Sequence, residues 1–435
     1  MRDTKMHLGV FLRGCGHHVS AWRHSSSRPD APADFNHYLD VARMAESAKF
    51  DIVFLADSLQ FDVHDMAAAS RMAPIGTGGH FEPISLLSAL AANTRKIGLV
   101  ATASTTFYEP FTVARIFASM DLISRGRVGW NVVTSTSKLE AQNFGTQYLN
   151  HGDRYERAME FCEVVKKLWT NWGPDAFPRD VERGIYFDPT ALSIPNHKGK
   201  FFDVRGPVVT VPSPQGKPLM FVAGASEKAI ELAAAHADAV FTAEPDKEKA
   251  KAFYKAVKDH ATQFGRTGDM IKIMPGVMPI VGATMAEAND LYEELQNLVS
   301  PEVGRQALRL VIGTDLNDYP EDGPVPELED IEGQQSRQKL FLRLARERNL
   351  TVKELYLEVA GARGHHVVIG TPSHVADVLV ERFHDYACDG FNVMAPTLPG
   401  GFKRFADMVV PELQERGVFR RDYSASTLRG HFNPH

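Results

Sequence analysis

Short apolar runs alternate with longer amphipathic segments about eight times along the chain, and this alternation limits the fold more than any other feature. Runs such as 51–56 (DIVFLA), 219–223 (LMFVA) and 390–395 (GFNVMA) are almost continuously apolar, which is typical of strands buried on both faces. The segments between the runs show helical spacing, and several begin with Asp or Pro. Strands that alternate with helices predict a parallel sheet, and the number of repeats favours a closed TIM (β/α)8 barrel.

The chain is longer than a bare barrel requires. It has 435 residues, whereas a bare eightfold barrel takes roughly 250. We expect a single barrel domain over residues 1–435, with insertions at about 173–217 and 296–365. The first insertion is rich in proline and too long for an ordinary connection. The second is acidic around 314–333, and we expect helix from 335 to 358.

Charge and cysteine content argue against several classes of protein. A formal net charge of -6 gives no electrostatic reason to expect nucleic acid or an anionic membrane as partner. Cys15, Cys162 and Cys388 are far apart and form no CxxC pair, which favours a reducing compartment. No run approaches the ~20 apolar residues of a membrane span, and we expect a cytoplasmic protein. No GxGxxG follows a predicted strand, so a dinucleotide site is not supported.

Polar side chains occur where three predicted strands end. Asp57 and Thr102 each follow an apolar run, and Asn131 lies near the end of a third run, 127–133. The carboxyl ends of parallel strands meet at one edge of a barrel, where ligand sites lie. A shared ligand site is therefore one interpretation. Asp57 and Thr102 could equally cap turns, which is common for these residue types.

The segment 223–226 (AGAS) joins a predicted strand to a predicted helix. The free amides of a helix's first turn and its positive dipole end favour anions. Gly224 allows close approach of the backbone, and Ser226 can donate its hydroxyl to a phosphate oxygen. An ordinary turn with Ser226 as helix cap explains the same residues.

The pentad 151–155 (HGDRY) precedes another predicted helix, and we expect Asp153 to cap it. His151 and Tyr155 are one helical turn apart, so both can face one ligand. Packing of these two side chains on the barrel rim is the simpler alternative.

Histidine and cysteine side chains gather at two places in the sequence. Cys15, His17 and His18 lie close together, but their spacing is too tight for a zinc site and no further ligand is evident. No acyl-transfer motif accompanies the thiol. His365 and His366 stand at the boundary of an insertion, and we expect them on the surface, with a role at the pocket mouth as the alternative. The sequence therefore predicts no metal site.

Several of these motifs together carry a resemblance to a known family. Residues 130–135 (WNVVTS), 143–145 (NFG), 151–155 (HGDRY) and 223–226 (AGAS) resemble the bacterial-luciferase-like superfamily of flavin-dependent monooxygenases. The similar branch contains nitrilotriacetate, dibenzothiophene-sulfone and long-chain alkane monooxygenases. The resemblance covers about residues 5–423 and implies the same barrel, with FMN and without metal. It implies flavin contacts at Asp57, Thr102, Asn131, His151, Tyr155, Ala225 and Ser226, and substrate contacts at Cys15 and His18.

The resemblance also implies an activity. The implied activity is that of the oxygenase component of a two-component monooxygenase. Such a component transfers one oxygen atom from O2 to a small organic substrate through a C4a-hydroperoxyflavin. A separate NAD(P)H:FMN reductase would supply reduced FMN by diffusion, and a homodimer or homotetramer is expected. In the alkane-oxidising relative a histidine follows the TS dipeptide, whereas this chain has Thr136, which argues against alkane oxidation.

Other functions remain compatible with the same residues. A non-catalytic flavin-binding protein would keep both the AGAS and the HGDRY motifs. A deazaflavin-dependent oxidoreductase can use the same barrel. A metal-dependent barrel hydrolase is disfavoured because no HxH motif follows the first strand.

Overall fold

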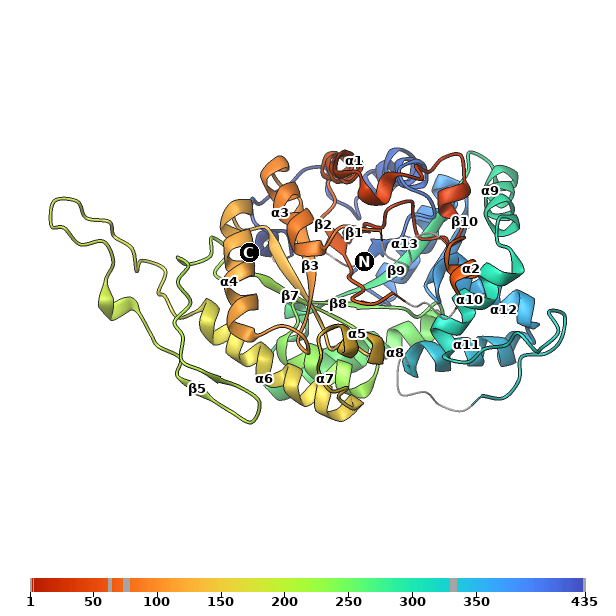
Figure 1. Cartoon of the computed structure of the whole chain (residues 1–435). Helices are drawn as coiled ribbons and strands as arrows, with labels where there is room; N and C mark the ends of the chain where they lie inside the picture. Colours follow the sequence, from red (N-terminus) through yellow and green to blue (C-terminus); the bar gives the residue numbers. More distant parts are fainter. Residues whose placement is uncertain (1, 3, 62–64, 73–78, 329–334, 433–435) are drawn as a thin grey trace.

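A closed barrel of parallel strands forms the centre of the protein (Figure 1). The computed structural model describes residues 2, 4–61, 65–72, 79–328 and 335–432. Within these residues, eight strands pair in chain order and the last pairs with the first, which confirms the predicted (β/α)8 barrel. The strands of the ring are β1 (His7–Phe11), β2 (Ile52–Leu55), β3 (Gly98–Ser104), β4 (Val128–Val133), β7 (Leu219–Ala223), β8 (Ala239–Thr242), β9 (Lys272–Val281) and β11 (Gly390–Val393).

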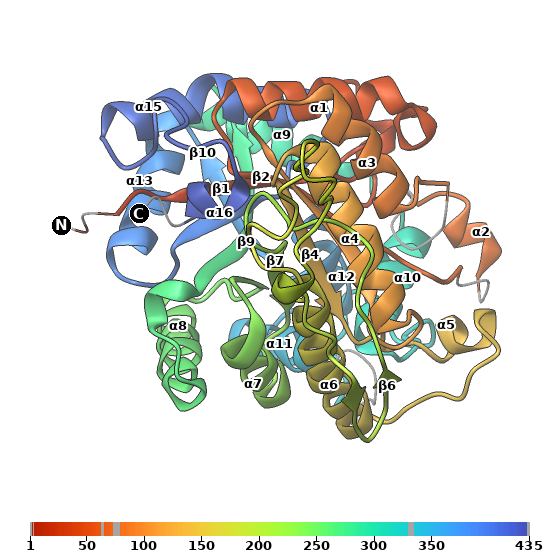
Figure 2. The same cartoon turned by 90° about the vertical axis from the view of Figure 1, so that its left-hand side faces the viewer.

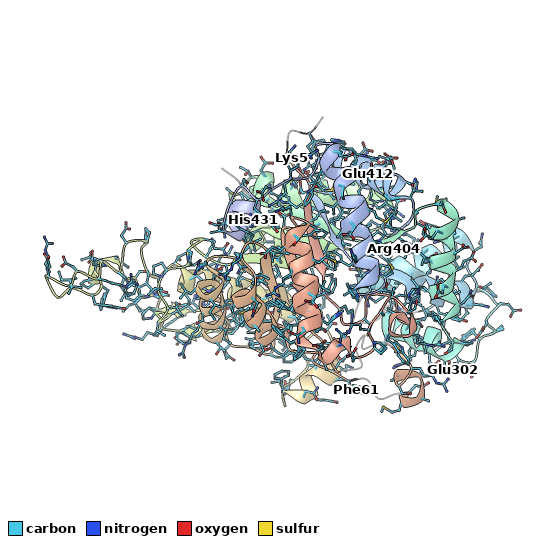
Figure 3. All side chains as sticks on the ribbon, turned by 90° about the horizontal axis from the view of Figure 1, so that it is seen from above. Lys5, Phe61, Glu302, Arg404, Glu412 and His431 are labelled. Carbon is cyan, nitrogen blue, oxygen red and sulfur yellow. The ribbon has the colours of Figure 1, made fainter. Side chains whose placement is uncertain are left out.

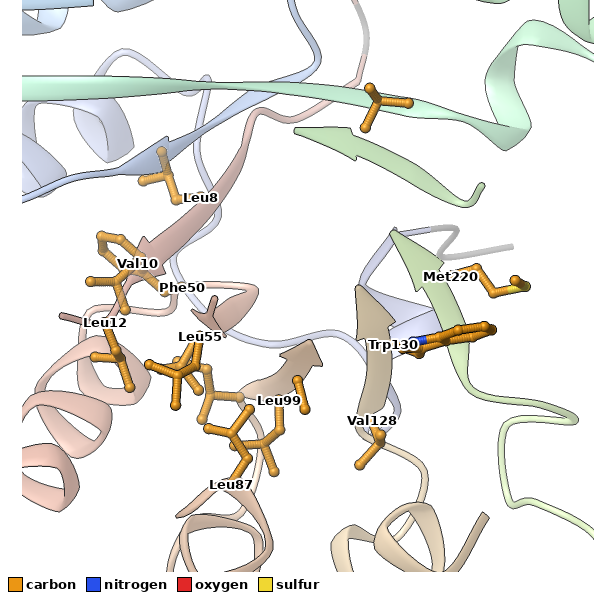
Figure 4. Packing of buried hydrophobic residues seen from close by; sticks show 14 of the residues in the cluster. Leu8, Val10, Leu12, Phe50, Leu55, Leu87, Leu99, Val128, Trp130 and Met220 are labelled. Atoms are coloured by element: carbon orange, nitrogen blue, oxygen red, sulfur yellow. The ribbon is translucent and has the colours of Figure 1, made fainter. Parts of the chain in front are cut away.

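Helices cover the outer faces of the strands. Outward-pointing side chains such as Leu99, Val128, Trp130 and Met220 are buried against them (Figure 4). The indole N–H of Trp130 donates to the Ala103 carbonyl at 3.0 Å, so this large buried side chain leaves no polar group unpaired. The covering helices are α1 (Phe35–Ser47), α3 (Pro83–Asn93), α4 (Pro110–Ser124), α6 (His151–Trp169), α7 (Glu227–His236), α8 (Lys247–Ala261), α13 (Pro372–His384), α14 (Gly400–Arg404) and α15 (Val410–Glu415).

Several helices begin where the sequence signals predict. Asp34 caps α1, because its carboxylate accepts from the Asn36 amide at 2.9 Å. Pro83 and Pro110 occupy the first helical position of α3 and α4, which suits their fixed φ. Arg125 follows α4 in the left-handed conformation and ends it before β4.

Apolar side chains close the amino-terminal end of the barrel. The short helix α16 (Leu428–Phe432) contributes Leu428 and Phe432 to the interior cluster that also contains Phe11 and Phe54. The rings of Phe432 and Phe221 lie 5.8 Å apart. Because this layer fills the amino-terminal end of the barrel, the space for a ligand lies at the carboxyl ends of the strands.

The segment 173–217 projects away from the barrel (Figures 1 and 3), and Figure 2 views the molecule from that side. Its exposed apolar side chains include Val181, Tyr186 and Phe187. It also holds a short antiparallel ladder, formed by β5 (His197–Lys198) and β6 (Asp203–Val204).

The segment 296–365 supplies helices with an apolar cluster of their own. The helix expected over 335–358 is present as two helices, and Thr351 caps the second in a capping box with Glu354. A further strand, β10 (His366–Gly370), follows and pairs with the second half of β9. In the described part of the chain, no helix has the length and apolar character that a bilayer span requires. The helices of this region are α10 (Pro301–Ile312), α11 (Gln335–Arg348) and α12 (Val352–Ala362), and α9 (Met285–Asn297) precedes them.

Candidate active site

A cavity of about 740 Å³ opens at the carboxyl edge of the barrel. The ends of β2, β3, β4, β7 and β8 line it, together with residues of α5 (Lys138–Asn143), α6, α7 and α11. This volume is within the range of cofactor and small-ligand sites. Six of the predicted site residues line this one cavity: Asp57, Thr102, His151, Tyr155, Ala225 and Ser226.

The AGAS turn forms one end of the cavity. Ser226 is the N-cap of α7 and accepts from the Ala229 amide at 3.2 Å, which leaves its hydroxyl proton available. Gly224 has a φ of +135°, and a Cβ built on it would lie 3.1 Å from the Ala229 Cβ and 3.9 Å from the Tyr155 hydroxyl. The turn therefore presents bare backbone and a helix N-terminus to the cavity, an arrangement that binds anions.

His151 and Tyr155 face this end of the cavity from α6, with ring centroids 4.9 Å apart. The prediction that Asp153 caps this helix is wrong. The helix begins at His151, and the N-cap is Asn150, whose side-chain oxygen accepts from the Asp153 amide at 2.9 Å. Asp153 lies instead in the first turn, where its carboxylate suits the helix dipole.

Arg154 of the same pentad is buried and does not line the cavity. Its Nη1 donates to the Tyr148 hydroxyl at 2.9 Å and to the Leu149 carbonyl at 2.7 Å. This arginine therefore fixes the loop that leads into α6, and so positions His151 and Tyr155.

Thr102 and Asn131 form a hydrogen-bonded pair on neighbouring strands. The Asn131 Nδ2 donates to the Thr102 Oγ1 at 2.9 Å, and that hydroxyl donates to the Leu55 carbonyl at 2.9 Å. Asn131 is buried and is not among the residues that line the cavity, and its Oδ1 has no hydrogen-bond partner in the described part of the chain. An unpaired buried acceptor is destabilising unless a ligand supplies the donor.

Two carboxyl groups line the cavity. Burial raises the pKa of Asp57, although the Ser58 amide donates to its Oδ1 at 2.9 Å. Burial also raises the pKa of Glu140, which the sequence analysis missed. Glu140 lies three residues after Ser137, the N-cap of α5, and this spacing is that of a capping box, so it gives no sign of a ligand site.

The backbone is also strained at one residue that lines the cavity. Ser135 has a φ of +46°, which is unusual for a residue with a side chain, and its hydroxyl lies 2.8 Å from that of Ser104. Ser135 and Ser104 both line the cavity. Strain of this kind tends to occur at ligand sites.

Helix α11 covers the cavity with Arg337, Lys339, Leu340 and Arg343. The sequence does not indicate these residues as part of a site, because nothing local distinguishes them from the exposed charges of an ordinary helix. Their position depends on how the 296–365 segment folds back over the barrel.

Cys15 and His18 do not line the cavity. The Cys15 thiol lies 3.3 Å from the Arg28 carbonyl oxygen, and burial raises its pKa to about 11, so the thiol is neutral. His18 Nε2 lies 3.2 Å from the Gln296 side-chain oxygen, and burial lowers the pKa of His18 to about 4. A substrate contact at these two residues stays a prediction.

The expectation that His365 and His366 form a surface pair is wrong for His365. This side chain is buried and stacks on Phe241, with centroids 5.1 Å apart. Its Nε2 accepts from the Arg337 Nη2 at 2.8 Å. Among the described residues, no group of three or more His, Cys, Asp or Glu side chains is arranged to hold a metal ion.

Comparisons with known proteins agree with this geometry. The family model described as luciferase-like monooxygenase matches residues 6–390. The chain is 48% identical over 435 residues to the N-acetyl-S-(2-succino)cysteine monooxygenase of Bacillus subtilis (strain 168), with 99% of this chain and 97% of the relative covered. It is 43% identical over 437 residues to nitrilotriacetate monooxygenase component A of Aminobacter aminovorans, with 99% and 96% covered. A crystal structure of a riboflavin lyase with modified FMN and riboflavin superposes with a TM-score of 0.89 at 32% identity, covering 99% of this chain and 96% of that one.

Proposed function

Because the chain belongs to the luciferase-like monooxygenase family, as its resemblance to nitrilotriacetate monooxygenase predicted, we propose that it is the oxygenase component of a two-component, FMN-dependent enzyme. It transfers one oxygen atom from O2 to a small organic substrate. The observation that carries this proposal is the single cavity that joins an anion-binding helix start to polar groups at the strand ends.

The AGAS end of the cavity fits the phosphate of FMN. The amides of Ala225 and of the first turn of α7, with the Ser226 hydroxyl, would hold the phosphate oxygens. His151 and Tyr155 lie at the same end and can donate further hydrogen bonds. When bound, reduced FMN supplies the electrons with which O2 is activated.

The strand-end groups fit the rest of the flavin. Among the described residues no donor reaches the buried Oδ1 of Asn131; a flavin N–H would supply one, and Thr102 fixes the amide in place. Burial raises the pKa of Asp57 and Glu140, so either group can hold a proton at a higher pH than in water.

Apolar side chains limit the access of water to this site. Val132, Val222, Leu232 and Phe241 line the cavity from the barrel and α7, and Leu340 lines it from α11. A low-dielectric site strengthens the polar contacts within it and protects reactive species from water.

The proposed partner is a separate NAD(P)H:FMN reductase that supplies reduced FMN by diffusion. The name component A of the nitrilotriacetate relative supports an enzyme of more than one component. The modified FMN in the similar riboflavin lyase structure supports FMN in preference to a deazaflavin.

The chain is also proposed to form a homodimer or homotetramer. The projecting segment 173–217 supports this, because it exposes 92% of Val181, 64% of Tyr186 and 41% of Phe187. Exposed apolar side chains gathered on one segment are typical of a protein interface.

Anaerobic titration with reduced FMN tests the cofactor, and a coupled assay with a flavin reductase, NADH, FMN and O2 tests the reaction. N-acetyl-S-(2-succino)cysteine and nitrilotriacetate are the first substrates to try, because they are named in the two relatives. We expect saturable flavin binding that Ser226→Glu abolishes, since a carboxylate there repels phosphate.

Ser300→Glu is the matched control, because Ser300 caps α10 in the same way and does not line the cavity. It should leave the flavin affinity unchanged. Absence of flavin binding to the unmodified protein would refute the proposal. Tight binding without oxidation of any substrate would favour the non-catalytic flavin-binding protein.

A further inference from the structure

Arginine and histidine side chains gather beside the cavity in a group that we name the cationic cluster: Arg13, His17, Arg337, Arg363 and His365. Hydrogen bonds connect four of them, and Arg13 acts on His17 and Arg363 through its charge. Arg337 Nη2 donates to His365 Nε2 at 2.8 Å, and Arg363 Nη2 donates to His17 Nδ1 at 2.7 Å. Arg337 also donates to the Arg363 carbonyl. The network therefore joins α11, the end of α12 and the segment that follows β1.

The cluster has no counter-charge among the described residues. None of its three guanidinium groups forms an ion pair with a described Asp or Glu. Burial lowers the pKa of Arg13 and of Arg337 to about 10. Burial and the charges of Arg13 and Arg337 lower the pKa of Arg363 as well. Because arginine keeps its proton in proteins, the cluster holds three positive charges together.

The two histidines cannot supply a negative charge, and they stay neutral. Burial and the neighbouring guanidinium groups lower the pKa of both His17 and His365 well below the ordinary value. Each neutral ring therefore has one nitrogen that accepts from an arginine. For His365 this is Nε2, which places its proton on Nδ1.

One buried donor of the cluster remains unused. Among the described residues, Arg363 Nη1 has no hydrogen-bond partner. Holding like charges together and leaving a buried donor unpaired are both destabilising for the protein alone. A ligand with negative oxygen atoms would relieve both.

The cluster adjoins the cavity at two points. Arg337 lines the cavity itself, and His365 stacks on Phe241, which also lines it. Arg343 also lines the cavity but forms an ion pair with Glu244 at 3.0 Å, so its charge is already compensated. The uncompensated charge is thus contributed by elements other than the AGAS turn and α7.

We propose that the cationic cluster binds the carboxylate groups of the substrate, and that the substrate is a small polycarboxylate with at least two negative charges. This inference rests on the proposed function and deepens it. Guanidinium groups bind carboxylates in a bidentate geometry, and several such contacts give both affinity and orientation. A neutral sulfone or hydrocarbon would leave the three charges uncompensated, so the cluster selects against such substrates.

Calorimetric titration with propane-1,2,3-tricarboxylate, in the presence and absence of FMN, tests this inference. The matched probe is the corresponding neutral triamide, which has a similar shape and no charge. We expect the protein to bind the tricarboxylate in preference to the triamide. Arg363→Gln and Arg337→Gln should each weaken tricarboxylate binding roughly 10- to 100-fold, because each removes a hydrogen bond to a charged group. The affinity for FMN should stay the same.

Arg346→Gln is the control for the two arginine variants. Arg346 belongs to the same helix α11, is exposed, and pairs with Glu327 at 3.1 Å away from the cavity. It should leave tricarboxylate binding unchanged. Thermal melting of the ligand-free variants provides a second measurement. Removing an uncompensated buried charge should leave the melting temperature unchanged or raise it, whereas the loss of a structural arginine would lower it.

Equal affinity for tricarboxylate and triamide would overturn the inference, and this comparison needs no variant. Unchanged tricarboxylate binding in both arginine variants would overturn it as well. If the arginine variants lost FMN binding and the unmodified protein bound no tricarboxylate, the cluster would belong to the flavin phosphate. Failure of the unmodified protein to bind FMN, with tricarboxylate binding intact, would refute the flavin proposal and support the anion site.

Discussion

Gly224→Ala should remove most of the flavin affinity while leaving the protein folded. The φ of Gly224 is +135°, and a side chain in that conformation costs about 1–3 kcal/mol. The new Cβ would also lie 3.1 Å from the Ala229 Cβ, so the turn must shift by a few tenths of an ångström. That shift moves the amides that are proposed to hold the phosphate. Loss of one hydrogen bond to a charged group corresponds to a roughly 10- to 100-fold weaker affinity.

Quenching of flavin fluorescence gives the affinity, and thermal melting gives the stability, of each variant. Gly265→Ala is the matched control. Gly265 also has a positive φ, +68°, but no atom of the described residues lies within 4 Å of the added Cβ, and the residue does not line the cavity. Both variants should melt at a lower temperature, because both strain the backbone. Gly224→Ala alone should lose flavin affinity. Wild-type affinity in that variant would refute the proposal that the AGAS turn binds the flavin phosphate.

Three further predictions concern stability and assembly. Burial alone would raise the pKa of Asp51, but the charge of Arg420 lowers it overall, so the stability it contributes is lost as the pH falls below about 4. Urea unfolding at several pH values should show this loss, and Asp51→Asn should flatten it. Trp130→Ala should lower the free energy of unfolding by about 3–5 kcal/mol in the same assay, because it empties a fully buried site. Tyr186→Ser combined with Phe187→Ser should shift the oligomer toward monomer in light scattering.

Each of these predictions has a control. Asp422→Asn removes an exposed partner of Lys49 and should leave the acid dependence unchanged. Phe264→Ala removes a side chain that is 40% exposed and should cost much less than Trp130→Ala. Tyr319→Ser alters an exposed tyrosine outside the projecting segment and should not change the oligomer. A flat acid profile in the unmodified protein, a small cost for Trp130→Ala, or an unchanged oligomer would each contradict the corresponding prediction.

The barrel could be predicted from the sequence because its strands carry the signal themselves. The strand that contains Trp130 is buried on both faces and is apolar except for Asn131, and a run of polar residues begins where it ends. The carboxyl ends of parallel strands must meet at one edge, so strand-end residues such as Asp57 and Thr102 were brought together by topology alone.

The position of Asp153 could not be fixed in this way. Asn150 and Asp153 are both good caps, and they are three residues apart, so local preference does not choose between them. The choice depends on the loop before the helix, which Arg154 holds through Tyr148 and Leu149. A contact between side chains decided the helix start, and residue type alone did not.

The residues with which α11 covers the cavity could not be predicted, for another reason. Arg337 and His365 are 28 positions apart and look like ordinary surface residues of an insertion. Their burial depends on how the 296–365 segment packs against β8 and the segment after β1. Sequence periodicity shows that α11 is a helix, but it does not show what that helix covers.

Helix α11 lies outside the hydrogen-bonded ring of strands, and yet it faces the cavity that the ring creates. The residues proposed to bind the flavin therefore belong to the barrel and its adjoining helices, whereas part of the charge proposed to bind the substrate belongs to a separate element. Substitutions in α11 can alter which molecules are accepted while the strands and the AGAS turn stay as they are. A scaffold divided in this way allows related enzymes to diverge in substrate specificity while they keep the same redox chemistry.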